Sequence, residues 1–247
     1  MHYALGFYLL STVLLLFWLY KPERSKLKNI GFLFLGVGFL TNICEILFEG
    51  QISSVFSVLS SIFSGIFFAI FLLLRRKELC KFSPVVATLS LIFYLLGLKV
   101  GTFKVSGLQI TLHVIASILA FGLLLFSALF SALRSAAESK LKRGELSLPF
   151  GLSLKLWIEL ETKTFFFGFI LLTADIVLNL IWLKTSKGSL ACDPRVCSVF
   201  ALWVYYWGLF HLRQFGVEPF KKRFHLFNTL GGIFVLTILL FAKHTAF

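Results

Sequence analysis

A short polar loop holds the residue types that are most unusual for this chain. Cys192 and Cys197 stand on either side of Asp193, and His211 ends the apolar run that follows. Two cysteines at this spacing can form a structural disulfide, or they can exchange disulfides with the thiols of another protein. We favour the structural bridge. The two apolar runs that flank the loop must position all of these groups.

Three polar side chains lie within apolar runs. Asp175 and Asn179 are one helical turn apart and share a face. A charge at the centre of a membrane helix costs at least about 2.5–3.5 kcal/mol on insertion scales, so Asp175 should be paired or protonated, and such a residue is a functional hypothesis. Glu45 has two interpretations: it is a functional carboxylate inside the bundle, or it lies close enough to the membrane surface to be solvated.

The composition is that of a membrane protein. Hydrophobic residues make up 58% of the 247 residues and charged residues 14%, against about 25% charged in soluble domains. Because each apolar run can cross about 30 Å of hydrocarbon, the sequence predicts an all-α polytopic membrane helix bundle with about eight transmembrane helices. Residues 1–108 would form an N-terminal four-helix membrane region, and residues 109–247 a second membrane domain. The predicted spans are 3–20, 30–48, 55–74, 84–99, 109–133, 164–184, 198–213 and 226–243.

Basic residues orient the bundle. The net charge is +13, and most of the 24 Lys and Arg residues fall on one set of loops. Because cytoplasmic loops are rich in Lys and Arg, that set is predicted to be cytoplasmic, with both termini and the cysteine loop outside. We therefore expect a multi-pass protein of the cell's inner (plasma) membrane. Its basic charge serves topology at the lipid bilayer, and no nucleic acid is expected as a partner.

The connection 134–163 is the longest loop of the predicted topology. Its second half alternates apolar and charged residues, which predicts an amphipathic stretch along the membrane interface with the Trp157 ring at headgroup level. The connection offers the largest cytoplasmic surface of the chain. A cytoplasmic enzyme or another partner would dock there.

His113 lies about one helical turn inside the outer end of the span 109–133. Ser117 and Phe121 follow at intervals of four residues, so all three share a face that looks into the bundle. Taken alone, a histidine in such a place is most simply a packed side chain bonded to a neighbour.

The second half of the chain carries the patterns of a known family. His113 and Val114 stand in LHVIASILAFGLL, which is similar to that family's HVxxxxxSYAxF. Gly168 and Trp182 stand in GFILLTADIVLNLIWLK, which is similar to GFPLLTxGIxxGAVWAN. The third pattern, DPKExWALITWLxYAxYLHxR, is similar without a gap to DPRVCSVFALWVYYWGLFHLR. Residues 109–247 thus resemble the cytochrome c assembly membrane proteins of the CcsA/CcmC/HemX type.

The resemblance implies a protein that handles haem on the outer face of the membrane. Two features set this chain apart from the family pattern. The tryptophan-rich outer segment WGxYWxWD is replaced by KTSKGSLACD, and two helix glycines are replaced by Asp175 and Asn179. The chain is therefore most similar to HemX-like members with a degenerate tryptophan-rich segment. Carried over residue by residue, the resemblance assigns cofactor binding to His113, Trp182, Asp193, Trp203, His211 and His244.

Haem iron takes two imidazoles from opposite faces, each through a nitrogen that is left free. His113 and His244 are the histidine pair that fits both the resemblance and the predicted topology, and they are the expected metal ligands. His211 and His225 lie near the cytoplasmic surface. There they would form a second, inner site, or His225 would simply contact lipid headgroups.

Three functions remain as alternatives. The first is cytochrome c assembly, in which the protein binds or presents haem near the outer face, beside an assembly partner subunit or an apocytochrome. The second is a HemX-like membrane regulator of tetrapyrrole synthesis without a stable haem site, acting through 134–163. The third is a small-molecule carrier that uses Asp175, Asn179 and Glu45. Because no nucleophile–base pair is visible, we expect no enzyme, at most a haem-delivery component of a cytochrome c synthetase.

Overall fold

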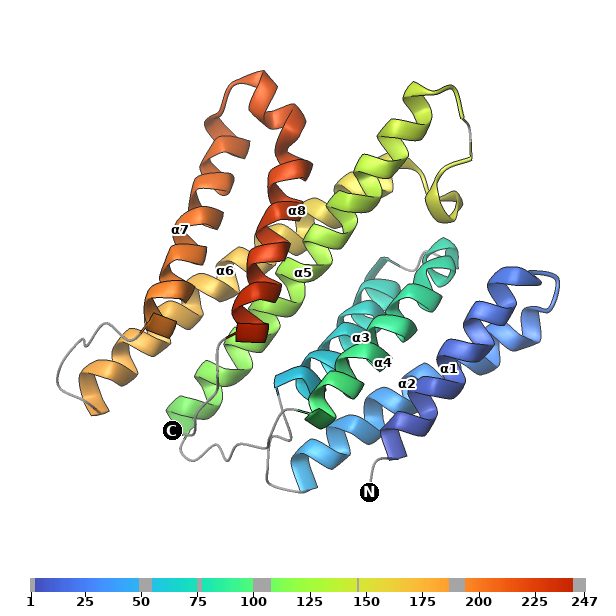
Figure 1. Cartoon of the computed structure of the whole chain (residues 1–247), viewed down its shortest axis with the longest axis horizontal. Helices are drawn as coiled ribbons and strands as arrows, with labels where there is room; N and C mark the ends of the chain where they lie inside the picture. The colour runs from blue at the N-terminus through green and yellow to red at the C-terminus, as the bar shows by residue number, and fades with distance from the viewer. Residues whose placement is uncertain are drawn as a thin grey trace. The chain divides into compact units, whose positions relative to one another are not determined.

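The described part of the chain is almost entirely helical (Figure 1). The computed structural model describes residues 3–48, 55–74, 77–99, 108–145, 147–186 and 194–241. These residues form eight α-helices and two short 3₁₀ helices, without a strand among them. Because an α-helix pairs its own backbone groups, it is the structure expected of segments that lie in hydrocarbon. The predicted all-α membrane bundle of about eight helices is confirmed.

Several helices are long and apolar enough to cross a membrane, and the chain is a membrane protein. Large apolar side chains such as Leu33, Phe167 and Val177 remain exposed on the outer faces of helices, as expected where the surroundings are lipid and not water. Within the described residues, the candidate spans are Tyr3–Tyr20, Ser25–Glu45, Leu79–Leu98, Ile115–Lys142 and Leu154–Ile181.

Contacts divide the chain into two compact units, Met1–Val105 and Ser106–Thr245. A 3₁₀ helix, Lys77–Phe82, leads into the last helix of the first unit. The helices of this unit are α1 (Tyr3–Tyr20), α2 (Ser25–Phe48), α3 (Val55–Leu74) and α4 (Ser83–Lys99).

Hydroxyl groups bond across the interior of the first unit. Tyr8 Oη lies 3.2 Å from Ser64 Oγ, and Ser60 Oγ donates to the carbonyl of Ser90 at 2.7 Å. These contacts join α3 to α1 and to α4. The serines of α3 thus serve close helix packing, which is the usual place of small residues in membrane bundles.

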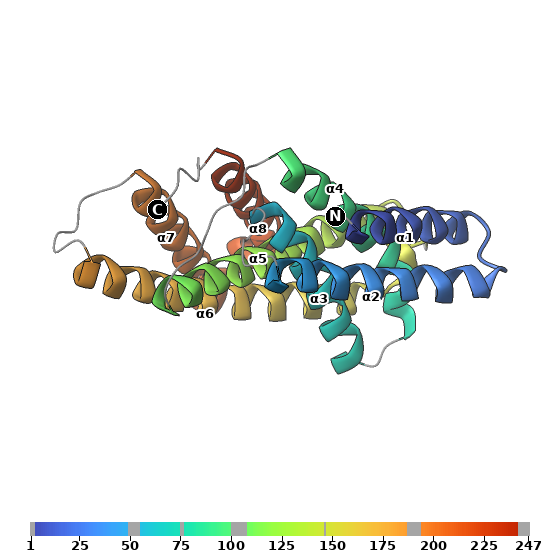
Figure 2. The ribbon, with the colours of Figure 1, turned by 90° about the horizontal axis from the view of Figure 1, so that it is seen from below.

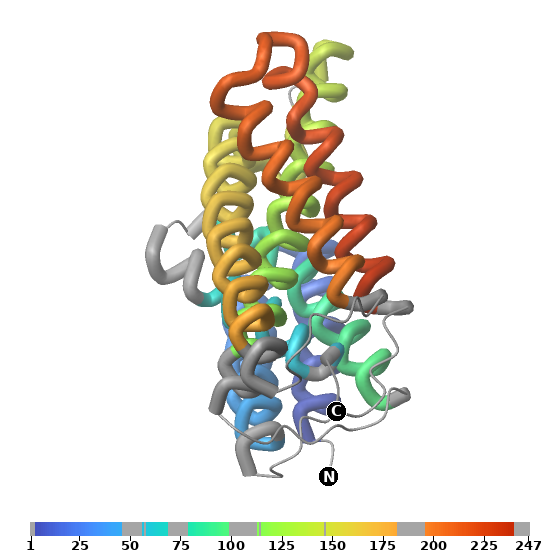
Figure 3. Tube along the Cα trace, turned by 90° about the vertical axis from the view of Figure 1, so that its left-hand side faces the viewer, coloured from blue at the N-terminus to red at the C-terminus, as the bar shows by residue number. Residues whose placement is uncertain are grey.

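The second unit is an antiparallel arrangement of four helices. Successive helices run in opposite directions, so α5 and α7 begin at the end of the unit where the described parts of α6 and α8 finish (Figures 1 and 3). We call this end the outer end, following the predicted orientation, and the opposite end the inner end. The four helices are α5 (Leu108–Lys142), α6 (Leu154–Ser186), α7 (Pro194–Phe215) and α8 (Glu218–Phe241).

Helices α5 and α6 lie side by side along a regular seam (Figure 2). On each helix the contacting residues recur every seven positions, a repeat that keeps one stripe of a helix facing its neighbour. At the middle of the seam, a Cβ added to Gly168 would lie 3.0 Å from the side chain of Leu124, so the two helices approach closely there. The three contacts are Glu161 with Ser131, Gly168 with Leu124, and Asp175 with Ser117.

The inner connection is much shorter than the predicted loop 134–163. Helix α5 continues through the charged stretch to Lys142, because its residues are strong helix formers. It ends at Gly144, which adopts a left-handed φ of 76°. The amide of Glu145 donates to the carbonyl of Lys140 at 3.0 Å, and the amide of Gly144 donates to that of Leu141 at 3.0 Å. This pair of bonds is the Schellman motif that closes helices.

Helix α6 begins soon afterwards. A short 3₁₀ turn, Pro149–Gly151, redirects the chain, and Ser153 then caps the helix. Its Oγ accepts the amide hydrogen of Leu156 at 3.3 Å, which satisfies one of the amides that a helix start leaves unpaired. The stretch predicted to lie along the membrane interface is therefore the first part of α6.

The prediction that Trp157 lies at headgroup level is wrong. The side chain is fully buried on α6, and its ring lies 6.0 Å from that of Phe130 and 6.4 Å from that of Phe150, measured between centroids. The apolar face of this stretch packs against α5 and the connection. An amphipathic pattern cannot by itself distinguish a neighbouring helix from lipid.

Candidate functional site

Asp175 is a buried carboxylate of α6 with two partners on α5. Only 1% of the residue is exposed. Ser117 Oγ donates to Asp175 Oδ1 at 2.7 Å, and His113 Nδ1 lies 2.7 Å from the same oxygen. His113 and Ser117 are one turn apart and share the predicted face, and the seam between α5 and α6 places that face opposite Asp175. These contacts offset the cost of a carboxylate at membrane depth.

His113 is held at one nitrogen of its ring. The Nδ1 contact to Asp175 is close, but it deviates from the direction of a well-aligned hydrogen bond, so we regard it as an electrostatic contact. Among the described residues, Nε2 has no hydrogen-bond partner, and the side chain is 21% exposed. The imidazole thus has one nitrogen against a carboxylate and the other available.

This arrangement is suited to metal coordination. Histidine ligands of metals usually place their second ring nitrogen against a carboxylate or a carbonyl, which fixes the tautomer and the ring orientation. No group of three His, Cys, Asp or Glu side chains gathers within the described residues, so a closed metal cage is not seen there. A haem, in contrast, needs only one protein side chain on each face of the iron.

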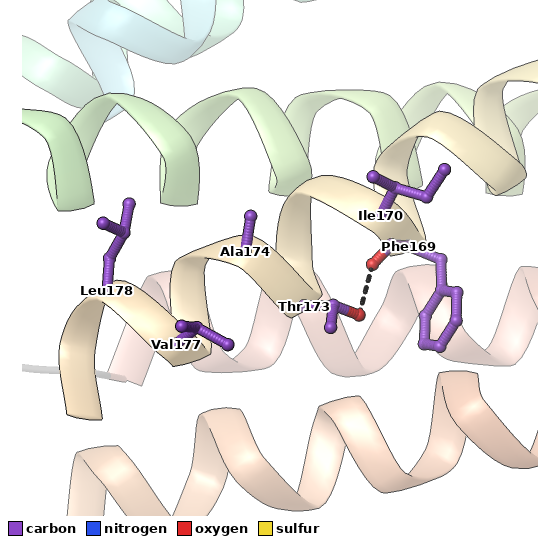
Figure 4. A pocket seen from close by; sticks show the side chains of 6 residues that line it. All are labelled: Phe169, Ile170, Thr173, Ala174, Val177 and Leu178. Atoms are coloured by element: carbon purple, nitrogen blue, oxygen red, sulfur yellow. Dashed lines mark hydrogen bonds between the residues drawn. The ribbon is translucent and has the colours of Figure 1, made fainter. Parts of the chain in front are cut away.

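Trp203 of α7 contacts α6 on another face. Its Nε1 donates to Thr173 Oγ1 at 3.0 Å, and Thr173 Oγ1 donates in turn to the carbonyl of Phe169 at 2.9 Å. Beside this contact lies an open apolar groove of about 650 Å³ (Figure 4), and Asp175 is not part of its lining. Its lining residues are Phe169, Ile170, Thr173, Ala174, Val177 and Leu178.

The other predicted residues near the outer end contribute less. Asn179 lies one turn beyond Asp175, is partly exposed, and makes no hydrogen bond within the described residues. Trp182 belongs to the last turns of α6, but its side chain lies outside the described part. Asp193 and His244 also lie outside the described residues.

Cys197 is the one predicted loop cysteine that the structure describes. It forms a disulfide, whereas Cys44 and Cys80 are free thiols. Its predicted partner, Cys192, lies outside the described residues, and the pairing of the two stays a prediction.

Glu45 has a structural contact in the first unit. Its Oε1 accepts the amide hydrogen of Ala4 at 3.3 Å, and its Oε2 accepts the hydroxyl hydrogen of Tyr94 at 2.9 Å. Ala4 is in the first turn of α1, where amides have no partner within the helix. Glu45 thus caps α1 and ties α2 to α4.

The inner end of the second unit holds another buried carboxylate, which the sequence analysis did not single out. Glu161 of α6 is fully buried and accepts hydrogen bonds from Arg134 Nη1, at 2.8 Å, and from Ser131 Oγ. Asn228 of α8 donates to Ser131 Oγ and to Ser127 Oγ, at 2.7 Å each. The network joins α5, α6 and α8.

His211 and His225 also lie at the inner end. The Nδ1 of His211 is 2.9 Å from the carbonyl of Trp207, and the two rings lie 4.2 Å apart. His225 is only 7% exposed, and its Nε2 lies 3.9 Å from Glu138 Oε2. A buried ring does not contact headgroups. The structure does not bring either histidine to His113, which is near the outer end of α5.

The sequence did not identify the partner of Asp175, although the spacing of residues on the two helices indicates it. Glu161, Gly168 and Asp175 recur every seven residues, and Ser117, Leu124 and Ser131 have the same spacing. Two helices joined by a short connection bring such stripes into register. If 134–163 is taken as a long loop, the sequence no longer sets the register between the two helices, and the contact between them cannot be predicted.

Comparison with known families gives one match. The family described as "Cytochrome C assembly protein" matches residues 25–245. The match begins within α2 and includes helices of both units, so it extends further than the region in which individual motifs are similar. No curated protein and no solved structure matches the chain significantly.

Proposed function

Because the chain belongs to the cytochrome c assembly protein family, and so has a role in cytochrome c maturation, we propose that it binds haem near the outer membrane face. The iron ligands in this proposal are His113 and His244. The observation that carries the proposal is the state of His113, whose Nδ1 lies 2.7 Å from a buried carboxylate while Nε2 is available.

The second unit supports a ligand from α8 at the same end. The described part of α8 finishes at Phe241, three residues before His244, and it does so at the outer end of the unit. Helix α8 also packs closely on α5, since a Cβ added to Gly232 would lie 2.3 Å from the Cβ of Ala128. The described part of α8 therefore finishes at the same end of the unit as the beginning of α5, three residues before His244.

The residues have separate tasks in this proposal. His113 and His244 hold the iron, which is the reactive centre that bound haem supplies. Cofactor binding by Trp182, Asp193 and Trp203 is carried over from the resemblance as part of the proposal. An apocytochrome or an assembly partner subunit would meet the protein at the outer end. His211 stays outside the set because it lies at the inner end. The protein would reside in the plasma membrane with the outer end facing away from the cytoplasm.

The absorbance spectrum of the purified protein tests the proposal. Protein expressed with ample haem and purified in detergent should show a Soret band. A pyridine haemochrome assay should give about one haem per chain. The double variant His113→Ala/His244→Ala should lose the band. Size-exclusion chromatography shows whether the variant remains folded.

A matched control is available at the inner end. His211→Ala removes an imidazole from the same unit without touching the proposed ligands, and it should keep the Soret band. A colourless wild-type protein, or a double variant that keeps its haem, contradicts the proposal. Equal loss in His211→Ala would move the site to the inner end.

A further inference from the structure

We propose, on the basis of the haem function above, that Asp175 and Ser117 make His113 a ligand that favours ferric over ferrous haem. The proposal concerns positioning residues, since neither Asp175 nor Ser117 reaches the iron in it. Both act on the Nδ1 side of the imidazole, opposite the nitrogen that binds.

The first support is the charge beside the ring. Asp175 Oδ1 lies 2.7 Å from His113 Nδ1 and is buried. A carboxylate at Nδ1 makes the opposite nitrogen a stronger donor, as carboxylate–histidine pairs do at other metal sites. Ferric haem carries one more positive charge than ferrous haem, and a nearby negative charge in a medium of low dielectric constant favours the more positive form.

The second support is that, within the described part of the chain, no Lys or Arg pairs with Asp175. Within the described residues its polar contacts are the hydroxyl of Ser117 and the imidazole of His113, with no Lys or Arg among them. Glu161 on the same helix is different, because Arg134 lies 2.8 Å from it. The charge of Asp175 can therefore act on the haem ligand, whereas that of Glu161 is already compensated.

The third support is the geometry that holds the carboxylate. Ser117 donates to the same oxygen that contacts His113 and comes from the adjacent turn of α5. This hydrogen bond restrains the Asp175 side chain with its Oδ1 facing His113 Nδ1. The negative charge beside Nδ1 favours the tautomer of His113 with hydrogen on Nδ1, which leaves the lone pair of Nε2 for a metal.

This feature distinguishes the chain from the family pattern that it resembles. That pattern has glycine at the positions of Asp175 and Asn179. A glycine offers no acceptor to His113, so the ferric preference is an addition of this chain.

Haem titrations test the preference. Detergent-purified apoprotein is titrated with ferric haem in air and with dithionite-reduced haem under argon, and the ratio of the two affinities is compared between wild type and Asp175→Asn. We expect the ratio to fall by about 10-fold or more, within the range seen when the hydrogen-bonding partners of metal ligands are substituted. Ser117→Ala should give a smaller fall. Asn179→Ala, one turn away on the same helix, should leave the ratio unchanged.

A haem-free measurement keeps the inference separate from the proposed function. In ¹⁵N-histidine-labelled apoprotein, the signals missing from His113→Gln identify His113. They should report hydrogen on Nδ1 in the wild type, and a mixture of tautomers in an Asp175→Gly variant.

The outcomes differ for the two proposals. If the wild type takes up neither form of haem, the haem function is overturned, and the ferric preference with it. If the wild type binds both forms through His113 and Asp175→Asn leaves the ratio unchanged, only the present inference is overturned. A freely exchanging tautomer in the wild type also overturns it.

Discussion

Helix α6 carries two buried carboxylates that are compensated in different ways. Glu161, at the inner end, is fully buried and lies against the guanidinium of Arg134. Asp175, at the outer end, is equally buried, and its polar contacts with described residues are a hydroxyl and an imidazole. The two residues are fourteen positions apart on one stripe of the helix, facing α5. The seam that holds them is the same, so the difference lies in the partners alone.

The difference separates a structural role from a functional one. Arg134 is always charged and pairs with both Glu161 and Glu138, at 2.8 Å each, so its charge is used within the protein. At the outer end His113 keeps one ring nitrogen without a partner among the described residues. A buried carboxylate thus locks helices together at one end, and in our proposal it prepares a haem ligand at the other.

The largest expected effect comes from removing the inner charge. Glu161→Gln leaves the largely buried guanidinium of Arg134 with Glu138 as its one ion-pair partner among the described residues. Breaking a buried pair by removing one member costs about 3–5 kcal/mol, and we expect the lower part of this range because Glu138 remains. The free energy of unfolding can be measured by SDS titration in mixed micelles, followed by circular dichroism. A variant as stable as the wild type would show that the inner network is not structural.

The seam itself is the next place to perturb. Gly168 lies midway between the two carboxylates. A Cβ added there would lie 3.0 Å from the side chain of Leu124. Gly168→Leu should force α5 and α6 apart and cost about 1–3 kcal/mol, as overpacking does. Gly208→Leu on α7 is the control, because a Cβ there meets nothing within 4 Å. Equal stability of the two variants in the same SDS assay would argue against a close seam.

A smaller loss is expected at α8. Asn228→Ala removes two hydrogen bonds to Ser127 and Ser131. Interhelical hydrogen bonds in membrane proteins contribute about 0.6 kcal/mol on average and about 1.7 kcal/mol at most, so the variant should lose about 1–2 kcal/mol. Thr237→Ala on the same helix is the control, since its hydroxyl only bonds to the carbonyl of Ile233. The SDS assay should rank Asn228→Ala clearly below this control.

The smallest effect is expected at the outer carboxylate. Asp175→Asn keeps the shape of the side chain and an acceptor oxygen, and it leaves no permanent charge unpaired. We therefore expect a change in the free energy of unfolding of less than about 1 kcal/mol. The contrast with Glu161→Gln is the sharpest check of the comparison. A loss at Asp175 as large as that at Glu161 would make the outer carboxylate a structural residue.

Much of the architecture could be predicted from the sequence. The eight α-helices of the described residues overlap the eight predicted spans, because a run of about twenty apolar residues has few alternatives to a helix in hydrocarbon. The family was also visible in combined motifs such as DPRVCSVFALWVYYWGLFHLR, and the family match agrees. The shared face of His113 and Ser117 followed from helical periodicity. All three are local or periodic properties of the chain.

The tertiary structure decided which residues meet. Asp175 could be predicted to need a partner, but the choice of His113 and Ser117 depends on the register between α5 and α6, and that register depends on helices that continue through 134–163. Trp157 shows the same limit, since its amphipathic surroundings fit lipid and a neighbouring helix equally well. The network around Glu161 needed three helices in place before its polar groups could satisfy one another. Hydrophobicity and period determine that a helix forms and which face is buried. Only packing determines what that face is buried against.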